Sequence, residues 1–182
     1  MTDRRTVLGI DPGLTITGFG VVEADAAGRD ATALAMGTIR TKAREPRADR
    51  LAQIAERVGE LIEAHRPDEV AIEQHFVAEN VRSAMAIGEA RAAVMVAAAS
   101  RGLPVYEYAP TAVKEAVAGH GGAPKEQLQQ MVMAQLNLTE EPSPLDVSDA
   151  LAIALTRLSD AQLEAMTAQA QTQAQTRAGG RS

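Results

Sequence analysis

The sequence of 182 residues contains no cysteine. Zinc sites with thiolate ligands, disulfides and cysteine nucleophiles are therefore excluded. The sequence also lacks an apolar run near the roughly 18 residues that a membrane-spanning helix needs. Its start, MTDRRTVLGI, has no secretory apolar core, because a strand-like segment begins at once. We therefore expect a cytoplasmic protein.

A surplus of positive charge is lacking as well. The chain has 18 Lys and Arg against 24 Asp and Glu, which gives a net charge of −6. This balance argues against a nucleic-acid binder, because such proteins contact phosphates with Lys and Arg. One segment has the opposite balance, 5 − 2 = +3, from Arg40, Lys42, Arg44, Arg47 and Arg50 against Glu45 and Asp49. A solvated loop before a helix is the alternative interpretation of this segment.

Hydrophobic patterning predicts an α/β domain with a mixed five-stranded sheet flanked by helices. The first three strands form an antiparallel meander, because short turn-forming segments separate them. The last two strands enclose a helix, and this order implies parallel pairing through a crossover. The predicted strands are 6–11, 15–22, 33–41, 69–73 and 103–108, and the predicted helices are 47–65, 79–100, 110–117 and 125–137.

The last helix is predicted to begin at an N-cap on Ser143, with Pro144 in its first turn and Asp146 as the capping-box acid. Beyond about residue 160 the composition shifts to Ala, Gln and Thr, which have little to bury. We therefore expect a domain over 1–159 and a disordered tail over 160–182. The helix at 79–100 is apolar on most of its circumference, so either it is buried in the domain or it meets a partner.

Four carboxylates occupy positions where packing gives no reason for a charge. Asp11 ends the run VLGID, Glu73 ends the run VAIE, and Asp146 and Asp149 share one helix face at spacing i, i+3. Carboxylates are the ligands that Mg²⁺ takes, and paired Mg²⁺ ions catalyse phosphodiester hydrolysis. Each residue alone also suits a structural role in a turn, a strand end or a helix cap. Their joint occurrence predicts a divalent-metal site in a nuclease.

The segments GIDPGLTITGFGVV, AIEQHFVAENVRSAMAIGEARA, VYEYAPTAVKEAV and DVSDALAIA resemble the RuvC family of Holliday junction resolvases, and the likeness extends over about 6–158. The resemblance implies a ribonuclease H-like fold and a homodimer that nicks two strands of four-way junction DNA symmetrically. It also implies two Mg²⁺ ions per site, with Mn²⁺ as an alternative, and the branch-migration proteins RuvA and RuvB as partners. The family's catalytic, metal-binding carboxylates fall on Asp11, Glu73, Asp146 and Asp149.

The resemblance further implies three DNA-binding residues. Phe76 matches an aromatic that the family sets against bases at the junction, and Lys114 and Lys125 match cations that hold phosphates. A half-buried anchor is the alternative for Phe76, and solvated side chains are the alternative for the lysines. Pro124 departs from the family, which commonly carries an acid before this lysine. His75 shares a strand face with Glu73 if that strand continues, and its part in catalysis is left open.

Two other functions compete with the nuclease. GIDPG followed by a hairpin also resembles the phosphate loop of actin-like and sugar-kinase ATPases, although those enzymes need two such domains in a longer chain. A non-catalytic binder of branched DNA is the third hypothesis. The intact set of four carboxylates argues against it.

Overall fold

The computed structural model describes residues 4–25, 28, 30–74 and 81–179, and the side chains as far as residue 172. Its five-stranded sheet has the order β3-β2-β1-β4-β5. Strands β1 (Arg4–Asp11), β2 (Ile16–Asp25) and β3 (Thr32–Arg40) form an antiparallel meander. Strands β4 (Glu69–Glu73) and β5 (Val105–Tyr108) continue the sheet in parallel with β1. The predicted mixed sheet is confirmed.

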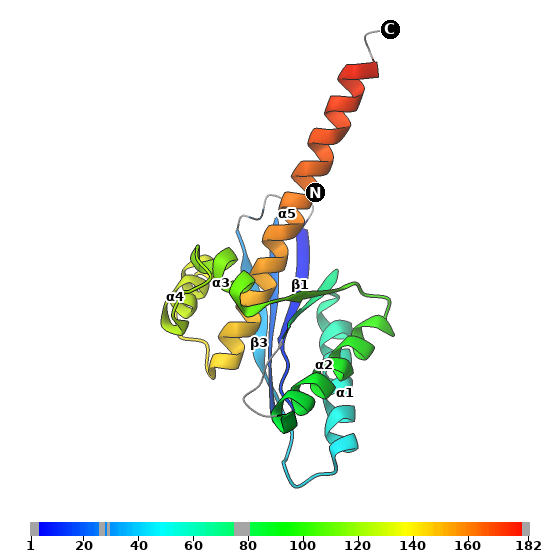
Figure 1. Ribbon diagram of the computed structural model, residues 1–182, viewed down its shortest axis with the longest axis vertical. Coiled ribbons are helices and arrows are strands. Elements are labelled where there is room, and N and C mark those ends of the chain that lie inside the picture. The colour runs from blue at the N-terminus through cyan, green and yellow to red at the C-terminus, as the bar shows by residue number, and fades with distance from the viewer. Residues whose placement is uncertain (1–3, 26–27, 29, 75–80, 180–182) are drawn as a thin grey trace.

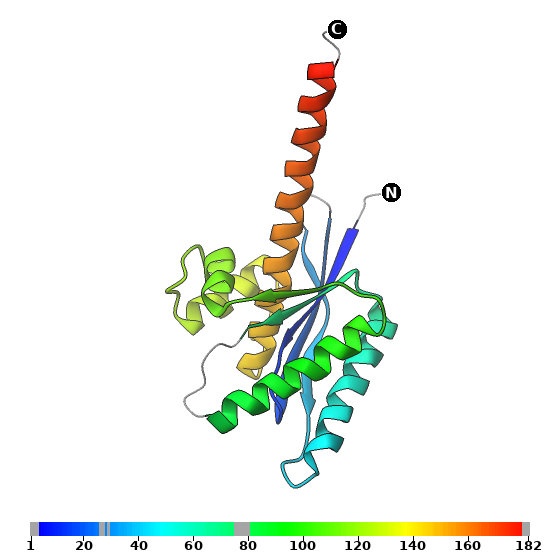
Figure 2. The ribbon, with the colours of Figure 1, turned by 45° about the vertical axis from the view of Figure 1, so that its right-hand side comes forward.

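Helices cover both faces of this sheet (Figures 1 and 2). On one face lie α1 (Arg47–His65) and α2 (Val81–Ala99). On the other lie α3 (Pro110–Ala118), α4 (Lys125–Leu136) and α5 (Leu145–Gly179). Because side chains alternate along a strand, β1 supplies both cores: Val7 packs with α5, and Leu8 packs with α1 and α2.

The contact between α5 and the sheet is unusually close, and glycines in β1 and β2 make it possible. A Cβ atom added to Gly18 would lie 2.0 Å from the carbonyl oxygen of Asp146, and one added to Gly9 would lie 2.1 Å from that of Ala150. No side chain fits in either space, so the α5 backbone lies directly on the sheet. This contact brings the start of α5 beside the end of β1.

Helix α5 differs from the sequence-based prediction at both ends. It begins at Leu145, so the cap position belongs to Pro144, one residue after the predicted N-cap Ser143. Its helical backbone continues to Gly179, through the segment for which disorder was expected. The Ala- and Gln-rich composition favours helix even where little is buried, and Arg157 pairs with Glu164 across the two turns after the expected boundary. The division into a domain over 1–159 and a tail over 160–182 stays a prediction.

Among the helices in the described ranges, none is both long enough and apolar enough to cross a bilayer.

Candidate active site

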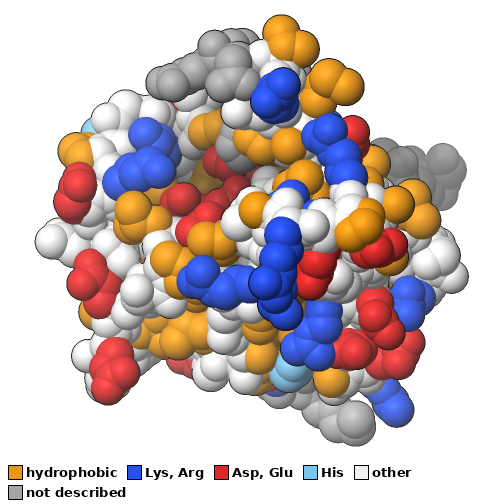
Figure 3. Space-filling view, turned by 90° about the horizontal axis from the view of Figure 1, so that it is seen from below, with side chains coloured by type: hydrophobic (Ala, Val, Ile, Leu, Met, Phe, Trp, Pro, Cys, Tyr) orange, Lys and Arg blue, Asp and Glu red, His pale blue; other side chains and the backbone are white. Residues whose placement is uncertain are grey.

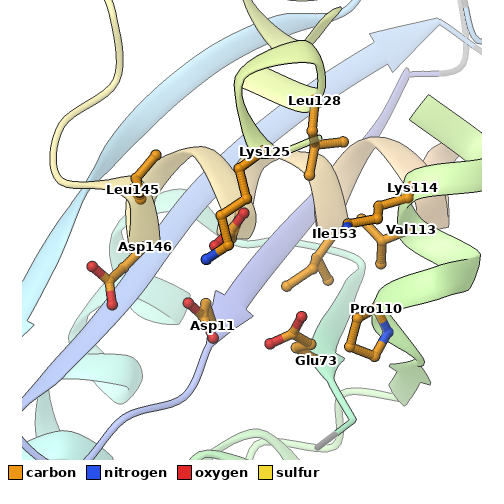
Figure 4. Close-up of a pocket in the computed structure, with 11 residues that line it drawn as sticks. Asp11, Glu73, Pro110, Val113, Lys114, Lys125, Leu128, Leu145, Asp146 and Ile153 are labelled. Carbon is orange, nitrogen blue, oxygen red and sulfur yellow. The ribbon is translucent and has the colours of Figure 1, made fainter. Parts of the chain in front are cut away.

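The ends of two neighbouring parallel strands carry the first two predicted carboxylates. Ile10 of β1 pairs with Ile72 of β4, so Asp11 and Glu73 occupy the next position on adjacent strands. Asp146 and Asp149, in the first turns of α5, line the same cavity. Figure 4 shows Asp146 on α5 beside Asp11. The three segments are far apart in the sequence. The fold brings them to one edge of the sheet.

These side chains surround a single cavity of about 480 Å³. Six of the seven residues predicted for catalysis, metal binding or DNA binding line it: Asp11, Glu73, Lys114, Lys125, Asp146 and Asp149. Apolar side chains form the rest of its wall, from Pro110, Val113, Leu128, Leu145 and Ile153. The structure thus brings the predicted groups together, and their roles stay predictions.

The carboxylates raise the electrostatic energy of one another. The pKa of Glu73 lies above its ordinary value of 4.5, first because of burial and second because of the negative charge of Asp149. A hydrogen bond with Asp11 and the charges of Lys125 and Lys114 act in the opposite direction. Two carboxyl groups hydrogen-bond to each other only if one of them holds a proton. The site therefore favours a proton or a cation between Asp11 and Glu73.

Two lysines approach the carboxylates from the helical side of the cavity. Lys114 comes from α3 and is half-buried, and Lys125 is the first residue of α4 and is exposed. In Figure 4 both amino groups lie within the cavity region, and Lys125 extends down toward the carboxylates. Pro124 directly precedes α4, in the cap position. Pro124 in place of the acid that is common in the family therefore leaves Lys125 at the helix start, where its side chain reaches the site.

The four carboxylates fit a divalent cation by their chemistry. Oxygen donors are what Mg²⁺ and related hard cations prefer, and a cation would offset both the burial and the charge of Asp149, which raise the pKa of Glu73. In the part of the chain that the structure describes, no three Asp, Glu or His side chains already converge closely enough to hold a metal. Rotation of the carboxylates toward a common centre would therefore accompany binding.

The turn after Asp11 is held by hydrogen bonds from both sides. Thr17 donates from Oγ1 to the carbonyl oxygen of Gly13 at 2.6 Å. Arg50 donates to the carbonyl oxygen of Leu14 at 3.2 Å and to Oγ1 of Thr15 at 2.9 Å. These contacts fix the segment that follows the carboxylate. Sequence reasoning missed this role of Arg50.

Arg50 had been counted with an exposed basic cluster, but the structure buries it, with 8% of its surface exposed. The available signal was its spacing, since Arg50, Ile54 and Val58 recur every four residues on the buried side of α1. Arg47 is also engaged, in an ion pair with Glu89. The exposed cationic character of this segment therefore rests on Arg40, Lys42 and Arg44.

Two of the residues considered from the sequence, Phe76 and His75, lie outside the described residues.

The view onto this end of the molecule shows acidic side chains in a hollow, with basic side chains on several sides of it (Figure 3). Basic side chains thus border the acidic centre, and further acidic side chains lie farther out in the same view. Such a pattern suits a polyanion that approaches through bound cations.

A mixed five-stranded sheet with helices on both faces, and carboxylates gathered where β1, β4 and α5 meet, defines a ribonuclease H-like nuclease. The family model "Crossover junction endodeoxyribonuclease RuvC" matches residues 7–157. The chain belongs to the RuvC family. Membership of this nuclease family implies a divalent metal cofactor.

Individual relatives agree with this assignment. The RuvC of Moorella thermoacetica is 51% identical over 149 residues, which cover 82% of this chain and 88% of that protein. The RuvC of Chromohalobacter salexigens is 52% identical over 150 residues, covering 82% and 78%. Thermus thermophilus RuvC, in the structure of its complex with a Holliday junction substrate, is 42% identical in sequence. The two structures match with a TM-score of 0.84 over 88% of this chain and 96% of that chain.

A more distant structure shares the fold. The yeast mitochondrial Holliday junction resolvase Ydc2 is 12% identical, with a TM-score of 0.63 over 88% of this chain and 82% of that one. At this identity the match supports the architecture alone.

Proposed function

We propose that this protein is a structure-specific DNA endonuclease that resolves Holliday junctions by paired symmetric nicks, in homologous recombination and DNA repair. The observation that carries the proposal is the single cavity in which four carboxylates and two lysines meet, in a chain of the RuvC family. Carboxylates alone would repel a phosphate backbone. Divalent cations and the lysines convert the same cavity into a phosphodiester site.

The division of labour follows from the chemistry of the side chains. Asp11, Glu73, Asp146 and Asp149 would hold two Mg²⁺ ions, with Mn²⁺ as the alternative metal. The bound ions would supply activation of the attacking water and stabilisation of the leaving 3′ oxygen. Lys114 and Lys125 would hold the phosphate next to these carboxylates. The products would carry 5′-phosphate and 3′-hydroxyl ends, as the resemblance implies.

A homodimer is part of this proposal, and the exposed side of α2 supports it. Val81, Met85 and Val96 are exposed by 76%, 56% and 65%. With the exposed small residues Gly88 and Ala92, they recur at spacings of three and four along one helix face. Small residues between larger apolar ones let two helix backbones approach closely. A second copy of α2 is therefore the occupant that we propose.

The dimer proposal has its own test. Ala92→Arg places a long charged side chain in the middle of this face, while the buried residues Ala90 and Val94 are kept. Sedimentation should show a dimer for the unsubstituted protein and a monomer for the variant, with similar circular dichroism. A monomeric unsubstituted protein would contradict the proposal.

Three further elements of the proposal rest on the resemblance. Phe76, outside the described residues, would stack on bases at the junction, where such contacts contribute roughly 1 to 3 kcal/mol per base. Association with RuvA and RuvB would couple cleavage to branch migration. A cytoplasmic location completes the proposal.

One assay separates the nuclease from its competitors. The protein is incubated with a labelled four-way junction, a linear duplex of the same sequence, or ATP, each with Mg²⁺ and with EDTA. We expect paired nicks in the junction with Mg²⁺, and neither duplex cleavage nor ATP hydrolysis. Junction binding without nicks would support the non-catalytic binder, and ATP hydrolysis would support the nucleotide-binding alternative.

A further inference from the structure

The loop between β3 and α1, residues 41–46, leaves the sheet at the edge that carries the carboxylates. Asp11 pairs with Gly18, and Gly18 pairs with Thr38, so the end of β3 lies level with the end of β1. Arg40, the last residue of β3, is two residues beyond Thr38 and directly precedes the loop. Figure 1 shows the loop at the lower end of the molecule, below the tip of β1.

Three cations, one at the end of β3 and two on this loop, face solvent. Arg40 and Arg44 are exposed, and the side chain of Lys42 is 68% exposed. Nζ of Lys42 lies 3.9 Å from Oε1 of Glu45. An exposed ion pair at this distance contributes little to stability. Within the described residues, neither Arg40 nor Arg44 forms an ion pair. The protein has a net charge of −6, so this local excess of positive charge is exceptional. It suits an anionic partner outside the chain.

Hydrogen bonds hold the start of the loop, while the cations face solvent. The buried guanidinium of Arg50 donates from Nε to Oγ1 of Thr41 at 2.8 Å, and Thr41 donates from Oγ1 to the carbonyl oxygen of Leu14 at 2.6 Å. The backbone N–H of Thr41 donates to Thr15 at 3.1 Å. The start of the loop is thus tied to the turn that follows Asp11. Such preorganisation lowers the entropy lost when a ligand binds.

The position of the loop complements that of the two lysines. Lys114 and Lys125 approach the carboxylates from α3 and α4, on the face of the sheet that α5 covers. The loop leads into α1, on the opposite face. A DNA strand whose phosphate lies at the carboxylates therefore has cations on both sides of it. Figure 3 shows basic side chains on more than one side of the acidic hollow.

We infer that Arg40, Lys42 and Arg44 form a second phosphate-binding surface, which contacts the backbone of a junction arm beside the cleavage site. The inference rests on the proposed function, because it assumes that DNA occupies the carboxylate cavity. The loop binds backbone rather than reacting atoms. It therefore governs affinity and leaves the rate of cleavage in the bound complex unchanged.

The test compares two double variants with the same total charge. Arg40→Gln/Arg44→Gln removes two positive charges beside the site. Arg66→Gln/Arg101→Gln removes two at the other end of α1 and α2, where Arg101 pairs with Glu63. Both change the net charge from −6 to −6 − 2 = −8. Junction Kd is measured in Ca²⁺ from 50 to 300 mM salt, and cleavage is measured in single turnover with Mg²⁺ at saturating protein.

For the loop variant we expect weaker junction binding and a salt dependence reduced by up to about 1.8 units, since each lost phosphate contact contributes about 0.9. Its single-turnover cleavage rate should match that of the unsubstituted protein. The control variant should keep the original salt dependence. Glu45→Gln, which changes the net charge from −6 to −5, should tighten binding.

Equal salt dependence in the loop and control variants would overturn the inference, as would weaker binding by Glu45→Gln. A lower single-turnover rate in the loop variant would also overturn it, because that result would assign the loop to the reaction itself. If the unsubstituted protein binds no junction, the proposed function fails first. The two failures are therefore distinguishable.

Discussion

The two ends of β4 place a glutamate in opposite electrostatic environments. Glu69, at its start, accepts hydrogen bonds from Arg157 at 2.6 and 3.1 Å and from Arg5 at 3.0 Å. The guanidinium of Arg157 also lies over the ring of Tyr106, at 3.6 Å from its centroid. Glu73, four residues later, lies beside Asp11 and Asp149, and burial together with the charge of Asp149 raises its pKa. One glutamate is neutralised by the protein, and the other is placed among like charges.

This difference separates stability from function. A buried carboxylate with arginine partners is satisfied in the folded chain, although such a pair adds little beyond what apolar residues would contribute. A carboxylate with a raised pKa, such as Glu73, destabilises the fold and persists where an external cation or proton completes the site. Helix α5 links both regions, since Asp149 and Arg157 lie about two turns apart on it. The same helix is anchored at one point and carries candidate site carboxylates at the other.

The largest expected effect is at the carboxylates. Asp11→Asn, Glu73→Gln, Asp146→Asn and Asp149→Asn each keep side-chain volume and remove one anionic ligand. Junction nicking should fall on the order of 10³-fold, because metal catalysis contributes several kcal/mol and each 1.36 kcal/mol is tenfold. Gel-shift affinity should be retained or improved, since a negative charge beside phosphate is lost. Near-normal nicking by any two of the four would refute the site.

The unsubstituted protein offers a matched control for these variants. Ca²⁺ in place of Mg²⁺ should support junction binding without nicking, because its coordination is looser and positions water poorly.

The anchored end should respond in stability instead. Arg157→Met leaves Glu69 buried without its main partner, so the free energy of unfolding should fall by about 3 to 5 kcal/mol. Glu164→Ala removes the partner of Arg157 whose side chain is 60% exposed and should cost less than about 1 kcal/mol. Urea denaturation measures both. Equal losses of unfolding free energy in the two variants would contradict this prediction. They would show that the buried pair of Arg157 with Glu69 matters no more to stability than the exposed pair with Glu164.

A smaller effect is expected at the lysines. Lys114→Ala or Lys125→Ala should weaken junction binding and reduce its salt dependence by about one unit per lost phosphate contact. The measurement is a titration at several salt concentrations. Denaturation of both variants should match the unsubstituted protein, and an unchanged salt dependence in both would contradict phosphate binding.

The smallest effect concerns pH. Because the pKa of Glu73 is raised in the folded protein, its protonated form is favoured there relative to the unfolded chain. Without divalent cations, the free energy of unfolding should therefore fall as the pH rises above 4.5 through the raised pKa. Glu73→Gln should remove this part of the pH dependence. Added Mg²⁺ should restore stability at neutral pH, and a flat profile in EDTA would contradict the raised pKa.

Much of the fold follows from local patterns in the sequence. The predicted helix over 47–65 coincides with α1, and the predicted strand over 69–73 coincides with β4. The parallel pairing of β4 and β5 followed from the helix between them. These predictions rest on periodicity and turn residues, which act over a few residues and need no knowledge of distant neighbours.

The helical continuation of α5 past residue 160 was not predicted. Its sequence has little to bury, so the hydrophobic pattern gave no signal there. Helix propensity and the continuity of a helix already formed act in its favour. The segment shows that lack of a core-facing stripe does not exclude regular structure.

The sequence by itself indicated the residues that line the cavity: four carboxylates at the ends of local elements, and two lysines that the family resemblance implied. Their roles stay predictions. Only the tertiary structure decided that Arg50 is a buried anchor rather than a surface cation, and that Arg157 neutralises Glu69 while Glu73 is left among carboxylates. The reason is physical. Residue type and spacing fix what a side chain can do, but its burial and its partners depend on segments that meet only when the chain folds.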